Sequence, residues 1–220
     1  MKKIFIPAYS TKSPDKAIKK SLRLICDYRS IGLLTTAQHI NQLDRVKKKL
    51  EKKAIKTKIG GQILGCDITA AKKIINDVDA YLYIGSGRFH ALSVAYITRK
   101  PVIVANPLSD FADQISSEEI MELNKARKAR IVLAYEANII GVLVSTKEGQ
   151  YNLDEALNVK EKIEAAGRRA LIFTGSELTP DNVLPFEVDA WVNTACPRIV
   201  EDYFNKPVLN EGELDIILGS

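Results

Sequence analysis

Long apolar runs are missing from this sequence of 220 residues, and a membrane-spanning helix would need one. The longest apolar stretches have the length of strands, as at 139–144, and the N-terminal residues 1–7 are too short for the apolar region of a secretory signal. Hydrophobic residues make up 46% and charged residues 27%, as in ordinary globular proteins. The sequence therefore predicts a cytoplasmic protein with no membrane partner and with one large or two small domains.

Cysteine and histidine are both scarce. The three cysteines include no CxxC pair, which argues against a disulfide scaffold and leaves a zinc site without a close pair of ligands. The two histidines, His39 and His90, are the available bases for a cysteine nucleophile. His90 follows a predicted strand and is at the right end of that strand to approach a cysteine loop. A Cys-His hydrolase therefore stays open, although no local nucleophile signature supports it.

Aromatic residues are few, at 7% of the chain. The net charge of +5 comes mainly from basic clusters at 47–53 and 125–130, both on helical patterns. Solvated helix faces are the favoured interpretation, and contact with an anionic partner such as RNA or a ribosome-bound protein is the alternative. Because few aromatic side chains interleave with these charges, the sequence carries no direct nucleic-acid signature.

Short β-branched runs alternate with longer amphipathic stretches, which predicts an α/β fold with parallel sheets flanked by helices. The predicted strands are Lys3–Ala8, Ile31–Thr35, Ile55–Ile59, Ala80–Ile84, Pro101–Ala105, Gly141–Ser145, Arg169–Phe173, Asp189–Asn193 and Pro207–Leu209. The predicted helices are Pro14–Tyr28, Ile40–Lys52, Thr69–Asn76, Phe89–Thr98, Ser117–Ile139 and Leu153–Ala166. The long helix divides the chain into two tandem domains, 1–130 with one cysteine loop and 131–220 with the other.

The cysteines differ in their surroundings. Cys66 and Cys196 each lie among small residues in a loop after a predicted strand, where ligands of parallel α/β domains bind. A metal ligand or nucleophile is favoured over a packing role at both positions, and the Cys-Pro pair at 196–197 also occurs in iron-sulfur ligand runs. Cys26 lies on a helix pattern beside apolar residues, which predicts a core position and makes it an unlikely metal ligand.

A glycine-containing loop follows the strand predicted at Ala80–Ile84. Its residues Gly85, Ser86 and Gly87 lead into a helix, so the loop amides are suited to cradle a carboxylate or phosphate. The loop lacks the third glycine of a dinucleotide fingerprint and the lysine of a P-loop. A tight strand-to-helix turn without a ligand explains the spacing equally well.

Seven segments together resemble the diphthamide synthase family, the 2-(3-amino-3-carboxypropyl)histidine synthases. In chain order they are IGLLTTAQH (31–39), GGQILGCD (60–67), AYLYIGSGRFHA (80–91), KPVIVANPLS (100–109), TKEGQY (146–151), VDAWVNTACPRI (188–199) and KPVLNEGEL (206–214). The two cysteine segments are the most specific, and the resemblance extends along nearly the whole chain.

The resemblance implies a transferase with iron-sulfur chemistry. In the family, three similar α/β domains each supply one cysteine to a 4Fe-4S cluster that meets S-adenosylmethionine. Cleavage of S-adenosylmethionine releases a 3-amino-3-carboxypropyl radical, which modifies one histidine of translation elongation factor 2. Cys66 and Cys196 correspond to two of the cluster ligands. Gly85, Ser86, Gly87, Phe89, His90, Gln150 and Arg198 are the expected cofactor-binding residues, with Arg198 suited to the methionine carboxylate.

The sequence also departs from the family, because the segment that begins at Met1 resembles the region after the first domain. The resemblance thus implies two cluster ligands in these 220 residues and a third from elsewhere. Three hypotheses follow. The chain is an enzyme subunit completed by a partner chain or homodimer, a divergent iron-sulfur protein that uses Cys26 or a water-derived ligand, or a non-catalytic relative that binds elongation factor 2 or an enzyme subunit.

Overall fold

The structure is a computed structural model that describes residues 6, 8–65 and 67–219. The chain folds into two compact units, Met1–Met121 and Glu122–Ser220. The division falls within the helix α5 (Ser117–Ala134), as does the boundary at 130 that the sequence suggested. Each unit has its own sheet and its own core.

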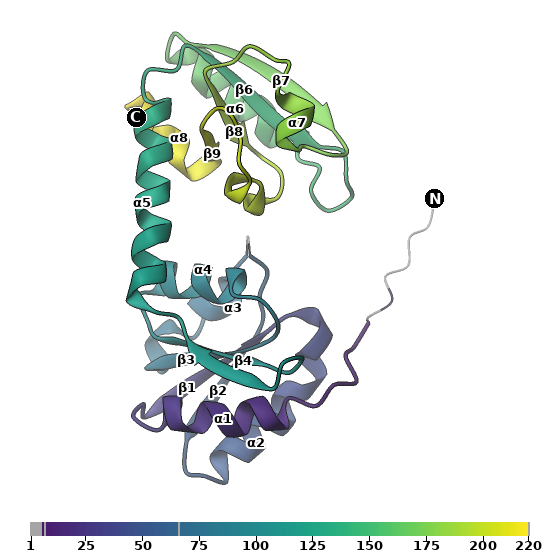
Figure 1. Ribbon diagram of the computed structural model, residues 1–220, viewed down its shortest axis with the longest axis vertical. Coiled ribbons are helices and arrows are strands. Elements are labelled where there is room, and N and C mark those ends of the chain that lie inside the picture. The colour runs from purple at the N-terminus through teal and green to yellow at the C-terminus, as the bar shows by residue number, and fades with distance from the viewer. Residues whose placement is uncertain (1–5, 7, 66, 220) are drawn as a thin grey trace. The chain divides into compact units, whose positions relative to one another are not determined.

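The first unit is built on a five-stranded sheet (Figure 1). Its strand order is β2-β1-β3-β4-β5, in which β5 runs antiparallel and the other four strands are parallel. The bounds are β1 (Ser30–Thr35), β2 (Lys56–Gln62), β3 (Ala80–Ile84), β4 (Val102–Asn106) and β5 (Phe111–Gln114). Strands β1, β3 and most of β4 are buried on both faces, which explains their continuous apolar runs.

Helices cover both faces of this sheet. On one face α1 (Asp15–Ile25) and α2 (Leu43–Glu51) pack on Leu33 and Leu82, and on the other α3 (Thr69–Lys72) and α4 (Phe89–Thr98) pack on Leu34 and Tyr83. Neighbouring strand residues thus point to opposite faces. The short helices η1 (Ala37–Gln42) and η2 (Ile75–Asp77) complete the described elements of this unit.

The second unit contains a smaller, fully parallel sheet with the order β7-β6-β8-β9. Its strands are β6 (Ile139–Ser145), β7 (Arg169–Gly175), β8 (Ala190–Asn193) and β9 (Val208–Asn210). One face is covered by the end of α5, by α6 (Leu153–Ala165) and by α8 (Glu211–Leu218). The other face holds the buried Trp191 near α7 (Pro180–Val183) and η3 (Pro197–Glu201). These connections bring the loops after β6, β7 and β8 to one edge of the sheet.

The structure confirms the predicted α/β class and corrects several details. The helix predicted over Ser117–Ile139 ends at Ala134, because the apolar run from Ile139 belongs to β6 and not to the helix. Strand β5 and helix α8 were not predicted. The strand predicted at Lys3–Ala8 falls mostly outside the described residues.

None of the described helices is both long and apolar enough to cross a membrane. The longest of them, α5, contains many charged residues along its 18 positions.

Candidate functional site

A cavity of about 500 Å³ lies at the carboxyl edge of the second sheet. Its lining comes from the segments that follow β6, β7 and β8, as expected where parallel strands end together. The lining residues are Ser145, Lys147, Gln150, Ser176, Glu177, Leu178, Thr179, Cys196, Arg198, Ile199 and Asp202. Three residues predicted from the sequence, Gln150, Cys196 and Arg198, are therefore brought together.

Cys196 is held by the side chain of Asn193 at the end of β8. The Asn193 Nδ2 atom donates to the Cys196 carbonyl at 2.9 Å and to Asn210 Oδ1 at 3.1 Å, and its Oδ1 accepts from the Ala195 amide at 3.0 Å. The Thr194 hydroxyl also donates to the Leu143 carbonyl on β6. Asn193 is only 3% exposed. A buried side-chain amide with several hydrogen-bond partners fixes the conformation of the loop. The backbone of Cys196 is therefore held in one position beside the cavity.

Sequence reasoning missed Asn193. Its position in the sequence could have indicated this role. An asparagine at the end of a buried strand, three residues before a cysteine, is suited to an Asx turn. Lys147 was missed as well. It follows the predicted strand Gly141–Ser145 in the same segment as Gln150, and basicity at that edge was the only indication.

The charges in the cavity have both signs. Lys147 and Arg198 contribute cations, and Glu177 and Asp202 contribute carboxylates, while Ser145, Ser176 and Thr179 add hydroxyls. A lining of this kind suits a small polar ligand that carries both a carboxylate and an amine. No histidine is among the lining residues that the structure describes, so this cavity gives a Cys-His hydrolase no base.

The other predicted binding residues form a second group in the first unit. Gly85, Ser86 and Gly87 make the turn after β3, and Phe89 and His90 begin α4. Gly87 has a φ of +76°, which a residue with a Cβ rarely adopts. The ring centroids of Phe89 and His90 are 5.5 Å apart. The turn supports both interpretations made from the sequence, and it gives no direct sign of a ligand.

Gly85 is required by a buried tyrosine. A Cβ at this position would lie 2.6 Å from the Tyr83 hydroxyl oxygen, closer than real atoms approach. Tyr83 is fully buried, and burial raises the pKa of its hydroxyl to about 12. The hydroxyl has no hydrogen-bond partner among the described residues. The absence of a side chain at Gly85 therefore allows Tyr83 to pack closely, whether or not it also allows a ligand to approach the backbone.

Phe89 packs against the segment that precedes Cys66. A Cβ on Gly65 would lie 1.8 Å from the Phe89 Cε1 atom, so the ring lies directly on the Gly65 backbone. The Leu64 amide donates to the Asp67 carbonyl at 2.9 Å, and the Asp67 amide returns a bond to the Leu64 carbonyl at 3.2 Å. Cys66 itself lies outside the described residues.

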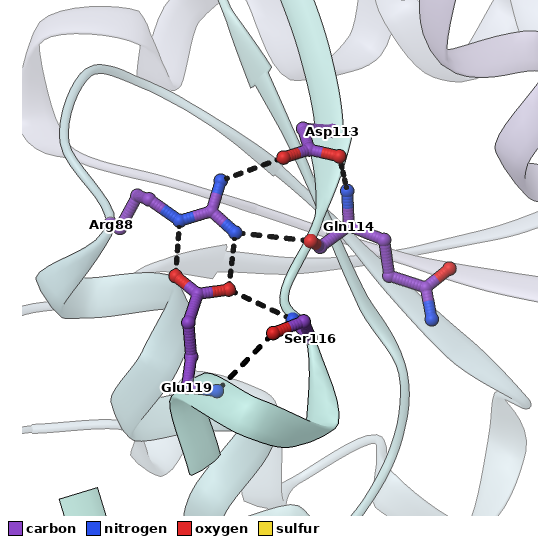
Figure 2. A network of polar contacts seen from close by, with 5 residues as sticks. All are labelled: Arg88, Asp113, Gln114, Ser116 and Glu119. Carbon is purple, nitrogen blue, oxygen red and sulfur yellow. Dashed lines mark hydrogen bonds and ion pairs between the residues drawn. The ribbon is translucent and has the colours of Figure 1, made fainter. Parts of the chain in front are cut away.

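Arg88, between the glycine turn and Phe89, makes an extensive polar network in this unit (Figure 2). Its Nε and Nη2 atoms each donate at 2.6 Å to one oxygen of Glu119, in the first turn of α5. Nη2 also donates to the Gln114 carbonyl at 3.0 Å, and Nη1 to Asp113 at 3.3 Å. The sequence placed Arg88 inside the predicted loop but assigned it no role.

Cys196 is a described residue whose chemistry suits an iron-sulfur cluster. Cys196 is a half-buried free thiol beside open space, which is the donor type that clusters use. Among residues 6, 8–65 and 67–219, no group of three or more His, Cys, Asp or Glu side chains is arranged to hold a metal ion. Cys26 is exposed at the end of α1, so the prediction that it fills the core is wrong. Its position at the end of a helix gives solvent access that the apolar neighbours did not reveal.

Comparison with known proteins gives consistent matches. The family model described as "Putative diphthamide synthesis protein" matches residues 1–220. A 2-(3-amino-3-carboxypropyl)histidine synthase of Pyrococcus horikoshii is 35% identical over 98% of this chain and 65% of its own length. A synthase of the same name from Methanocaldococcus jannaschii is 32% identical over 99% of this chain and 62% of its own length.

A solved structure agrees with these sequence matches. The crystal structure of Dph2 from Pyrococcus horikoshii with a 4Fe-4S cluster superposes with a TM-score of 0.87 at 35% identity, and the match covers 98% of this chain and 65% of that one. The 220 residues thus span slightly less than two thirds of the relatives that they match.

Proposed function

The chain belongs to the diphthamide synthesis protein family, and from this we propose that it takes part in transferring a 3-amino-3-carboxypropyl group from S-adenosylmethionine to a histidine. The observation that carries the proposal is the cavity at the end of the second sheet, where Cys196, Gln150 and Arg198 meet. Relatives matched over almost the entire chain are named for this activity.

Cys196 and Cys66 are our proposed ligands of a 4Fe-4S cluster. Thiolates at these two positions would hold such a cluster, and the cluster in its reduced form would supply the electron for cleavage of S-adenosylmethionine. The protein's own contribution at Cys196 is orientation. Asn193 fixes the backbone of the loop through the Cys196 carbonyl, so Cys196 is held among the residues that line the cavity.

The cavity in our proposal receives the amino acid portion of S-adenosylmethionine. Lys147 and Arg198 attract the carboxylate, and Glu177 or Asp202 accepts from the ammonium group. Gln150 provides a neutral hydrogen-bonding group beside them. This arrangement orients the ligand by its two charges, and the glycine turn 85–87 with Phe89 and His90 stays a proposed binding segment of the first unit.

The third cluster ligand, in this proposal, comes from polypeptide outside these 220 residues. The chain spans 65% of the Pyrococcus relative, so the complete reaction is proposed for an assembly and not for this chain alone. A separate partner chain or a second copy are the two proposed sources. The proposed acceptor is a histidine of translation elongation factor 2.

A non-catalytic relative is the second candidate function. It rests on the match of the fold itself, which extends over 98% of this chain and does not depend on the two cysteines. Such a protein retains the fold to bind elongation factor 2 or an enzyme subunit, and neither Cys66 nor Cys196 is needed for that binding.

Anaerobic reconstitution with iron and sulfide tests the proposal. We compare the wild type with Cys66→Ser, Cys196→Ser and Cys26→Ser, each alone and mixed with a polypeptide that carries the remainder of the family length. Iron content and the absorbance of the cluster are measured, and the cleavage products of S-adenosylmethionine are measured after reduction with dithionite. Cys26→Ser is the matched control, because this thiol is exposed after α1 and lies outside the cavity.

We expect bound iron and cleavage products in the mixture for the wild type and for Cys26→Ser, and loss of both for the other two variants. Iron binding that is unaffected by both substitutions contradicts the ligand assignment. A wild type that never holds iron, but binds elongation factor 2 equally well with both cysteines replaced, supports the non-catalytic candidate instead.

A further inference from the structure

We propose that the Arg88–Glu119 ion pair is a positioning device that holds the Phe89 ring on the Gly65 backbone and so fixes the turn adjacent to Cys66. The inference rests on the proposed function only for the importance of Cys66 as a ligand. Its contacts are all within the first unit, and sequence reasoning had assigned Arg88 no role.

Arg88 makes several hydrogen bonds in addition to its ion pair with Glu119. Arg88 donates four hydrogen bonds to three residues, and two of these bonds form a bidentate pair with Glu119 (Figure 2). The Arg88 side chain is 38% exposed and the Glu119 side chain 29%. A bidentate guanidinium–carboxylate pair has a fixed planar geometry, so it restrains direction as well as distance.

Glu119 is itself anchored at the start of α5. Its Oε2 atom accepts from the Ser116 amide at 2.9 Å, and the Glu119 amide donates to the Ser116 hydroxyl at 3.2 Å. These reciprocal bonds form a capping box. The hydrogen bond from Arg88 lowers the pKa of Glu119, which keeps the carboxylate charged. The arginine is thus tied to a helix terminus that is already fixed.

The restraint passes to the neighbouring residue along the chain. Arg88 precedes Phe89, the first residue of α4, and no described side chain caps the start of this helix. The Ser93 hydroxyl donates to the Phe89 carbonyl and the Leu92 amide to the Arg88 carbonyl, and the Arg88 side chain adds a restraint from outside the helix. Phe89 in turn lies on Gly65, where a Cβ would be 1.8 Å from the ring.

The turn that Phe89 contacts is closed by its own hydrogen bonds. Leu64 and Asp67 exchange backbone bonds of 2.9 and 3.2 Å. The Asp67 carboxylate also accepts from the Thr69 amide at 2.8 Å, at the start of α3. The ring is the packing contact on the Gly65 side of this turn. Loss of the ion pair should therefore loosen the turn without unfolding the sheet beneath it.

A purely stabilising ion pair is the competing explanation, and the chemical reactivity of Cys66 distinguishes the two. We measure alkylation of each cysteine by iodoacetamide, resolved by peptide mass spectrometry, in the apoprotein. Cys196 in the second unit and the exposed Cys26 after α1 are the internal references for reagent and pH, and far-UV circular dichroism of each variant reports general unfolding. The readout needs no iron and no S-adenosylmethionine.

The variants remove the ion pair in graded steps. Glu119→Gln keeps an oxygen for the capping box and loses the charge, while Arg88→Lys keeps the charge and loses the bidentate geometry. Asp77→Asn is the matched control, because it removes the exposed Lys58–Asp77 pair of the same unit. Phe89→Leu removes the ring contact with the Gly65 backbone while leaving the ion pair in place.

We expect alkylation of Cys66 to become roughly threefold faster or more in Glu119→Gln, Arg88→Lys and Phe89→Leu, because a released turn samples open conformations more often. In these three variants, Cys26 and Cys196 should be alkylated at wild-type rates. In the Asp77→Asn control, Cys66 should also keep its wild-type rate. Adding Glu119→Gln to Phe89→Leu should give little further increase, because both act through one contact.

Unchanged Cys66 rates in folded Glu119→Gln and Arg88→Lys proteins overturn the proposal. Acceleration of Cys66 that occurs only together with loss of the folded circular dichroism signal also overturns it, because it reveals general unfolding and not local positioning. A wild type that binds no iron refutes the proposed function but leaves this result standing, so the two failures are distinguishable.

Discussion

At the scale of single residues, several glycines are explained by the aromatic side chains beside them. A Cβ on Gly85 would collide with the Tyr83 hydroxyl, one on Gly65 with Phe89, and one on Gly141 with Trp191. The sequence indicated backbone access to a ligand at Gly85. The structure adds a packing requirement, because a ring packed against the main chain leaves no room for a side chain.

Gly141→Ala should destabilise the second unit. The new Cβ would lie 2.2 Å from the Trp191 Cζ3 atom and 3.2 Å from Phe173, and Trp191 is fully buried. Overpacking of this kind costs roughly 1–3 kcal/mol of unfolding free energy. Denaturant titration followed by Trp191 fluorescence measures the change.

Gly212→Ala is the control in the same unit. No described atom lies within 4 Å of a Cβ built there, and the residue is in the first turn of α8. Replacing a helical glycine by alanine without a clash stabilises by roughly 0.5–1 kcal/mol. If Gly141→Ala is as stable as the wild type, the close approach of Trp191 is not rigid.

At the scale of elements, short-range sequence signals located the start of the longest helix better than its end. The predicted start at Ser117 is that of α5, and the structure shows a capping box between Ser116 and Glu119 there. The end of α5 was missed by five residues, since the apolar positions of the helix run into those of β6. Strand β5 has only 4 residues and pairs antiparallel with β4 at the sheet edge, so its sequence carries little periodicity.

The start of α5 should contribute to the pH dependence of stability. Because hydrogen bonding to Arg88 lowers the pKa of Glu119 in the folded state, its contribution is complete above the ordinary value of 4.5 and is lost as pH falls through the folded pKa. We expect Glu119→Gln to cost about 1 kcal/mol at pH 7, since the pair is partly exposed.

The difference between the wild type and Glu119→Gln should shrink as pH falls below 4.5 and through the lowered pKa of Glu119, in thermal unfolding curves recorded at pH 7 and at several pH values below 4.5. A difference that stays constant between these values would mean that the charge of Glu119 contributes nothing, and that the substitution acts through shape alone.

At the scale of the whole molecule, two separate sets of buried residues divide the chain. Among the described residues, the apolar clusters of the first sheet and those of the second have no buried member in common. The predicted cluster ligands are divided in the same way, with Cys66 in the range of the first unit and Cys196 in the second. The proposed function therefore depends on both units and on further polypeptide.

The Gly141→Ala substitution also tests how independent the units are. We expect faster amide hydrogen exchange in β6 and β8 and unchanged exchange in β1 and β3, because opening follows the local core. Exchange measured by mass spectrometry resolves these strands. Equal acceleration in both sheets would show that the chain unfolds as one cooperative unit.

The candidate site could be predicted in part. The position of Cys196 after a strand was enough to place it at the carboxyl edge of a parallel sheet, and the resemblance to a family added Gln150 and Arg198, which line the same cavity. Asn193 and Lys147 were missed, since their roles depend on which loops meet at that edge. Contacts between these loops join residues that are distant in the chain, and no local sequence pattern indicates such contacts.

The sequence alone determined the α/β class and the place of Cys196 in a loop after a strand, because these follow from local periodicity and from specific motifs. Only the tertiary structure decided that Asn193 holds the Cys196 loop, that Cys26 is exposed, and that Arg88 reaches Glu119. The physical reason is that a side chain's partners are set by packing between segments far apart in sequence. Glu119 lies 31 positions after Arg88, and the fold of β4 and β5 between them brings the two together.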